Sequence, residues 1–178
     1  MVLLLKANYT DYIITNHILK KAVVLIDTRE KENAHIISWL DKKGISHQEC
    51  KLSFGDYGLL VLKNEEYGIM HDLLLDYAVE RKGSLEELSG NFTNDRDRIK
   101  YEFWRGSGKM DIVIENGSWD LIMSASYNTQ YDKNSFIATL ITFKHRFGVS
   151  PNFVSKEHSG ELIYKLLFYK LREELKGD

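Results

Sequence analysis

The feature that most constrains the fold is an unbroken aliphatic run, Ala22–Ile26, which is followed directly by Asp27, Thr28, Arg29 and Glu30. A strand with one face in water alternates apolar and polar residues, so an uninterrupted apolar run indicates a strand covered on both faces, as in α/β sheets. Open α/β sheets bind their ligands at the carboxyl ends of strands. The run therefore predicts a layered α/β fold and marks Asp27 as a candidate site residue.

A second stretch, residues 54–82, carries most of the chemistry. It begins with Gly55-Asp56 and closes with Glu80-Arg81-Lys82. Glu80 and Lys82 are two apart, so on a strand they point to the same face. Two carboxylates and a lysine at strand ends are typical of a site in which oxygen ligands hold a hard divalent cation and the lysine steadies developing charge. The alternative interpretation is a hairpin with a surface ion pair.

The remaining elements predict a mixed sheet flanked by helices. Strands are expected over residues 45–52, 59–63 and 77–82, and because these follow one another without helices, the sheet is not doubly wound and parallel. Short strands follow over 111–115 and 152–154. Helices are expected over residues 30–43, 94–104, 119–124, 135–147 and 159–176, and from a capping box at Ser84 up to a break at Gly90 and Asn91.

Length and composition favour one domain of 178 residues, with a lead-in segment (1–20), a core (21–155) and a C-terminal helix (156–178). The single cysteine, Cys50, cannot form an internal disulfide. No segment approaches the ~20 apolar residues of a membrane span. We therefore expect an intracellular, cytoplasmic protein. The net charge of -2 is not that of a general nucleic-acid coat, but it leaves a nuclease open.

These motifs together resemble the nuclease domain of the XPF family, a branch of the PD-(D/E)xK superfamily. The match rests on residues 24–30, Gly55-Asp56-Tyr57 and residues 79–82, and it covers about residues 22–155. It looks closest to small stand-alone versions encoded by phages and prophages (a host cytoplasm, if so). The resemblance implies a restriction-endonuclease-like α/β fold and a Mg²⁺- or Mn²⁺-dependent endonuclease that cuts branched, flapped or forked DNA.

The resemblance also implies roles for individual residues. Asp27, Asp56 and Glu80 would be the metal-side acids, together with the backbone carbonyl of Arg81. Lys82 would position or activate the attacking water. Arg29 and Arg81 would orient the acids or contact a phosphate.

The chain departs from the family pattern after the Glu-Arg-Lys motif. The family has an aspartate there, whereas this chain offers Glu86 by spacing or Glu87 by the acid-before-leucine pattern. Arg98 and Glu102 resemble an Arg-x-x-x-Gln pair in which Glu replaces Gln. We find no tandem helix-hairpin-helix segment after residue 155, so the dimerisation and junction specificity of the larger members do not carry over.

Further residues suit nucleic-acid contacts. Arg96, Arg98, Lys100 and Arg105 are candidates for phosphate contacts, with a solvated helix face as the alternative. Tyr127, Tyr131 and Lys133 are candidates for stacking on an unpaired base. Two other functions stay open beside the endonuclease: a Holliday-junction resolvase acting as a homodimer, and a catalytically inactive DNA-binding module.

Overall fold

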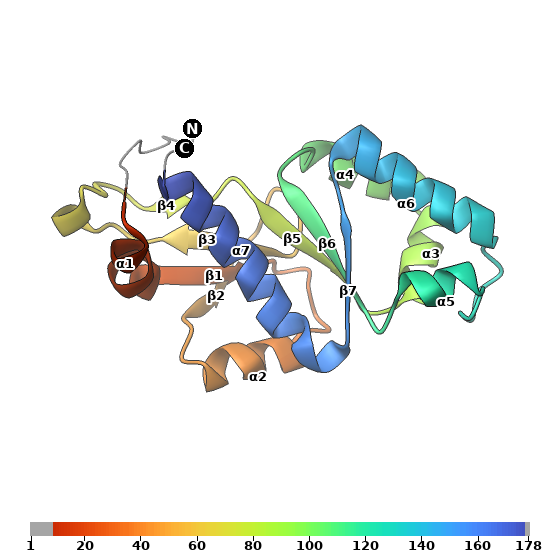
Figure 1. The fold of residues 1–178 in the computed structure, drawn as a ribbon, viewed down its shortest axis with the longest axis horizontal. Helices are drawn as coiled ribbons and strands as arrows, with labels where there is room; N and C mark the ends of the chain where they lie inside the picture. The colour runs from red at the N-terminus through yellow and green to blue at the C-terminus, as the bar shows by residue number, and fades with distance from the viewer. Residues whose placement is uncertain (1–8, 177–178) are drawn as a thin grey trace.

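The structure, a computed structural model, describes residues 9–176 and is built on one seven-stranded mixed sheet (Figure 1). The strand order is β2-β1-β3-β5-β6-β7, and β4 pairs with β3 beside this path. The strands are β1 (Ala22–Ile26), β2 (His47–Glu49), β3 (Tyr57–Val61), β4 (Leu73–Leu74), β5 (Ala78–Lys82), β6 (Met110–Glu115) and β7 (Pro151–Val154).

The sheet is mixed because its middle strands are antiparallel. β3 runs antiparallel to β1, β4 and β5, whereas β1 with β2, β5 with β6 and β6 with β7 are parallel pairs. The parallel pairs need crossovers, which the helices supply. The expected mixed central sheet is confirmed.

Helices cover both faces of the sheet. On one face, α2 (Ala34–Lys42) packs against α7 (Ser159–Lys176), which lies in front of the sheet in Figure 1 and contacts β3, β5 and β6. The other face of β6 is covered by four helices: α3 (Leu85–Thr93), α4 (Arg96–Arg105), α5 (Trp119–Met123) and α6 (Lys133–Phe147).

Strand β6 shows how the sequence divides its apolar residues between the two layers. Val113 belongs to the cluster under α2 and α7, and its neighbours Ile112 and Ile114 belong to the cluster under α3 to α6. Successive side chains of a strand point to opposite faces, so an all-apolar strand fills two cores at once.

The chain entering the sheet is helical, as expected from Thr10, whose Oγ1 accepts a hydrogen bond from the Ile13 amide. It forms α1 (Asp11–Ile13), η1 (Ile14–Ile18) and η2 (Leu19–Lys21). Two further short turns are η3 (Glu65–Tyr67) and η4 (Lys156–His158). Among residues 9–176, no helix is both long and apolar enough to cross a bilayer.

Some element boundaries differ from the expectation. Helix α2 begins at Ala34 rather than residue 30, and β2 has only three residues. Helix α3 continues through Gly90 and Asn91 to Thr93, so the expected break there was wrong. The reason is packing: Leu85, Leu88 and Phe92 share one buried face, and their burial outweighs the low helix propensity of two residues.

Candidate active site

Asp56 is held at the junction of three strands by the backbone around it. Its amide donates to the Val79 carbonyl of β5 at 2.9 Å, and its carbonyl accepts from the Asp27 amide after β1 at 2.8 Å. The preceding residue must be glycine, because Gly55 has φ +67 and a Cβ there would lie 2.7 Å from Cβ of Ala78. The Gly-Asp motif is therefore a close backbone crossing that fixes the aspartate.

Strand β5 presents Glu80 and Lys82 to one face of the sheet, as their spacing predicted. Lys82 Nζ lies 2.5 Å from Glu80 Oε1. Both side chains are buried, with 2% and 6% of the residue exposed. In the described part of the chain, Glu80 Oε2 is buried and has no hydrogen-bond partner. The surface-hairpin alternative is wrong, because a surface ion pair would be solvated.

The carboxylates of this cluster oppose one another electrostatically. Burial raises the pKa of Asp56 well above its usual value, and the charge of Glu80 adds to the rise, while Lys82 opposes it. Burial lowers the pKa of Lys82, but the charges of Glu80 and Asp56 outweigh this and the net shift is upward. Lys82 therefore stays an ammonium ion.

The Asp27 carboxylate lies in a set of hydrogen bonds of its own. Its Oδ1 accepts from the amide and Nε of Arg29, and its Oδ2 accepts from Nη2 of Arg29 and from the Leu52 amide, at 2.6 to 3.1 Å. These hydrogen bonds outweigh burial and lower the pKa of Asp27. Both oxygens of Asp27 thus accept hydrogen bonds from Arg29 or Leu52 in this structure, and its role as a metal ligand stays a prediction.

Arg29 itself lies at the rim of the site. More than half of its side chain is exposed, 56%. The hydrogen bond to Asp27 raises its pKa most, and the charges of Glu102 and Asp56 act in the same direction. An exposed guanidinium oriented by a carboxylate is suited to bind a phosphate, and this contact stays a prediction.

Arg81 points the opposite way, towards α2 and α7. Its Nε and Nη2 donate to the two oxygens of Glu115 at 2.9 and 2.8 Å, and Nη1 lies 3.5 Å from Glu30 Oε1. Glu115 also contacts His35 of α2 at 2.6 Å. Of the two roles implied for Arg81, orienting carboxylates or contacting a phosphate, these contacts favour the first, because the guanidinium is buried and its charge is matched. Only its backbone remains on the Asp56 side, where the Arg81 amide donates to Asp56 Oδ2 at 2.8 Å.

The two glutamates that follow the Glu-Arg-Lys motif, Glu86 and Glu87, contact different groups. Glu87 Oε1 lies 3.7 Å from Lys82 Nζ, and its Oε2 accepts from the Gly83 amide at 2.7 Å. Glu86 instead accepts from the Asn128 amide in the loop between α5 and α6. Glu87 is thus the acid beside the cluster; Ser84 Oγ accepts from its amide, and the Gly83 amide holds its carboxylate.

Helix α4 contributes a further carboxylate. Glu102 is buried, burial raises its pKa, and the charge of Glu80 adds to the rise while Lys82 and Arg29 oppose it. In the sequence Glu102 stands out only as the Glu that replaces Gln in the Arg-x-x-x-Gln pair. The signal that points it inward is its position three residues after Ile99 and next to Phe103.

The cations of α4 stay on the surface. Arg98 pairs with Asp95 at 3.5 Å and approaches Glu102 at 4.0 Å, and Lys100 pairs with Asp97 at 3.5 Å. Arg96 and Arg105 are exposed. Tyr127 and Tyr131, the expected stacking residues, are half-buried and pack edge-on against Phe136, so stacking on a base stays a prediction for them.

Residues 9–176 contain no set of three or more His, Cys, Asp or Glu side chains arranged as a metal site. The donors nevertheless fit a hard cation with fewer protein ligands. Glu80 offers a buried carboxylate oxygen without a partner, and Asp56 lies beside it with a pKa raised by burial and by Glu80. A divalent cation relieves this crowding of carboxylates, and Mg²⁺ in particular takes one or two protein carboxylates and keeps its waters.

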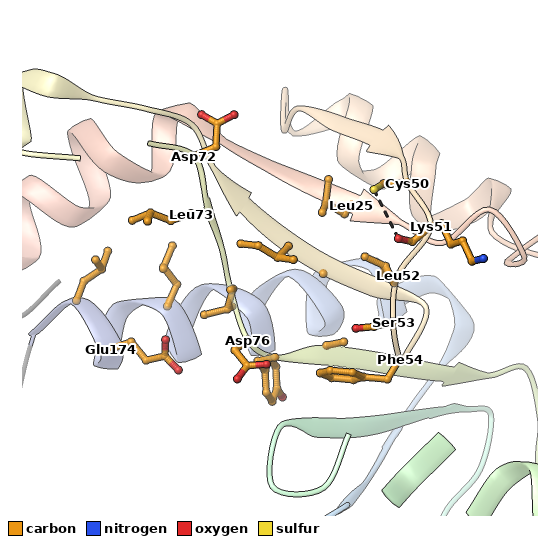
Figure 2. Close-up of a pocket in the computed structure, with 17 residues that line it drawn as sticks. Leu25, Cys50, Lys51, Leu52, Ser53, Phe54, Asp72, Leu73, Asp76 and Glu174 are labelled. Atoms are coloured by element: carbon orange, nitrogen blue, oxygen red, sulfur yellow. Dashed lines mark hydrogen bonds between the residues drawn. The ribbon is translucent and has the colours of Figure 1, made fainter. Parts of the chain in front are cut away.

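A separate cavity of about 510 Å³ is lined by residues 50–54, residues 72–78 and α7 (Figure 2). Its walls are mostly apolar and include Leu52, Phe54, Leu73, Leu171 and Leu175. Asp56, Glu80 and Lys82 do not line it. The chemistry therefore does not lie in this cavity.

The fold is similar to that of solved structures of XPF. XPF from Aeropyrum pernix superposes with a TM-score of 0.60 at 18% identity over 84% of this chain. The structure described as "XPF from Aeropyrum pernix, complex with DNA" gives 0.59 and 17% over 85%. This chain spans 65% and 66% of those two chains. The restriction-endonuclease-like fold predicted from the sequence is confirmed.

The family model described as "ERCC4 domain" matches residues 26–166. The chain belongs to the ERCC4 domain family, which confirms the predicted kinship with XPF nuclease domains. No curated protein matches the chain. The likeness to phage-encoded members stays a prediction.

Proposed function

We propose that this protein is a metal-dependent DNA endonuclease that hydrolyses phosphodiester bonds in branched, flapped or forked DNA. The observation that carries the proposal is the buried cluster of Asp56, Glu80 and Lys82, in which a carboxylate oxygen without a partner lies beside an ion-paired ammonium. Family membership and the DNA complex of a relative with this fold support the same substrate class.

Asp56, Glu80 and the Arg81 carbonyl would hold Mg²⁺ or Mn²⁺. The bound ion supplies a more acidic water and neutralises charge on the phosphate. The protein's own side chains donate hydrogen bonds to the reacting groups and bind the DNA. Lys82, kept charged by its neighbours, donates to the attacking water or to the oxygen on which charge develops. Arg29 binds a neighbouring phosphate from the rim, and Asp27 keeps its guanidinium in place.

The test is cleavage of end-labelled linear, flapped, forked and four-way DNA with Mg²⁺ or Mn²⁺. Wild type should cut at least one branched form, and Asp56→Asn and Lys82→Ala should each lower the rate by about 100-fold or more. Lys170→Ala is a matched control, since Lys170 makes its ion pair with Glu174 on α7. Each variant must melt cooperatively. Tight DNA binding without cleavage by the wild type would instead establish an inactive binding module.

Gel filtration with and without four-way DNA addresses the resolvase alternative. A resolvase needs two active sites and therefore a dimer on the junction. A monomer that cuts flapped DNA but leaves four-way junctions intact would support the proposal. A dimer that cuts only junctions would overturn the substrate assignment while leaving the chemistry in place.

A further inference from the structure

Helix α4 carries an exposed aromatic pair that the fold does not use. Tyr101 and Trp104 are 59% and 62% exposed, and their rings stack with centroids 5.6 Å apart and an interplanar angle of 25°. The Arg105 guanidinium lies over the Tyr101 ring, 5.2 Å from its centroid. Single exposed aromatics are common on protein surfaces. An ordered stack of two rings and a guanidinium is a preformed flat surface.

Helix α4 links the pair to the candidate active site. Its inner face buries Ile99, Glu102 and Phe103, and Glu102 lies close enough to the acid cluster for the charge of Glu80 to raise its pKa. Tyr101 and Trp104 lie on the outer, exposed side of the same helix. Arg98 and Arg105 are also exposed on α4.

We propose that Tyr101, Trp104 and Arg105 form a stacking platform for an unpaired base of DNA bound along α4. This inference rests on the proposed nuclease function and adds that these three residues give the protein a preference for single-stranded DNA. Every base has a face that stacks on an aromatic ring, so the preference is for an unpaired base and not for a sequence. Bases in a duplex are already stacked on each other and cannot use the platform.

The charge around the platform selects nucleic acid over an apolar partner. Arg96 and Arg105 are exposed on the same helix, and Arg98 and Lys100 make ion pairs only at 3.5 to 4.0 Å. Cations beside an aromatic surface match a strand that presents phosphates and bases alternately. A hydrophobic protein partner would leave these cations desolvated.

The test is DNA binding by fluorescence anisotropy in EDTA, where no cleavage occurs. The probes are a labelled single strand, the same strand with a run of abasic sites, and a blunt duplex. Trp104→Ala should weaken single-strand binding about 5- to 100-fold, and Trp104→Phe should keep most of the affinity. The variant should change binding of the duplex and of the abasic strand by less than about twofold, since neither offers a free base.

Tyr169→Ala is the matched control, because Tyr169 on α7 is also exposed (53%) and also lies under an arginine, Arg172. Its binding should equal that of wild type. An equal loss for duplex and single strand, a loss in Tyr169→Ala as large as in Trp104→Ala, or an oligomer that dissociates on Trp104→Ala would overturn the platform. If the binding pattern holds and no DNA is cut with metal, the nuclease function fails and the platform stands.

Discussion

Lys82 Nζ lies 2.5 Å from Glu80 Oε1, and within residues 9–176 the other oxygen of that carboxylate has no hydrogen-bond partner. One oxygen is thus neutralised and the other is left free in a buried position. A buried acceptor without a partner costs about 1–3 kcal/mol. A buried acceptor of this kind is expected where the protein binds a ligand.

Binding of a divalent ion should therefore stabilise the folded protein. At a concentration about 100 times its dissociation constant, Mn²⁺ or Mg²⁺ should add about 2.7 kcal/mol to the free energy of unfolding. Glu80→Gln and Asp56→Asn should abolish this gain, and EDTA should reverse it in the wild type. Thermal denaturation with and without metal measures it. Equal stabilisation of wild type and Glu80→Gln would place the ion elsewhere.

The two glutamates of α3 should differ in their effect on cleavage. Glu87→Gln keeps a hydrogen-bonding group near the Gly83 amide but removes the charge 3.7 Å from Lys82. We expect the cleavage rate to fall by about 10- to 100-fold, the usual effect of losing a partner that orients a site residue. Glu86→Gln, whose partner is the Asn128 amide, should cut like wild type. The reverse order would show that the family spacing, not this contact, identifies the acid.

Breaking the pair between Arg81 and Glu115 should destabilise the fold. Glu115 is fully buried, and Glu115→Ala leaves the Arg81 guanidinium with only the more distant Glu30. Removing one partner of a buried ion pair costs about 3–5 kcal/mol. Urea denaturation measures the free energy of unfolding. Glu161→Ala, which breaks an exposed pair with Lys165, should leave the urea midpoint unchanged.

Alkaline pH should unfold the protein through two buried tyrosines. Burial raises the pKa of Tyr57 and of Tyr77, and the hydrogen bond that Tyr77 donates to Asp111 adds to its rise. Because these raised values favour the neutral form, the tyrosines contribute stability that is present below about pH 10, the ordinary tyrosine pKa, and is lost above it. Denaturant midpoints measured from pH 8 to 11 should fall less in Tyr57→Phe than in wild type.

At neutral pH, Tyr57→Phe removes the hydroxyl and keeps the ring, so it measures the contribution of the hydroxyl to the free energy of unfolding. The Tyr57 hydroxyl is buried without a partner in the described chain, so its removal should be neutral or stabilising. Tyr77→Phe, which loses the bond to Asp111, should cost about 1 kcal/mol. A larger loss in Tyr57→Phe than in Tyr77→Phe would show that a water or a metal-side group satisfies the Tyr57 hydroxyl.

Local sequence was sufficient to predict the mixed sheet, the Gly55-Asp56 motif as part of the candidate site, and the shared face of Glu80 and Lys82. These features follow from a turn that only glycine permits and from the period of two along a strand. The same period of two also predicts that the Arg81 side chain points to the face opposite Lys82. The family resemblance instead implied that its charge could contact a phosphate.

Only the tertiary structure decided which acids are free. Asp27 accepts hydrogen bonds from Arg29 and Leu52, Glu115 pairs with the Arg81 guanidinium, and Glu87 rather than Glu86 approaches Lys82. Leu52, Glu115 and the Glu86 partner Asn128 all come from a separate strand or loop. The energy of a buried charge is set by whichever group completes its hydrogen bonds. Which group lies there depends on how the chain packs, and no pattern along the sequence shows it.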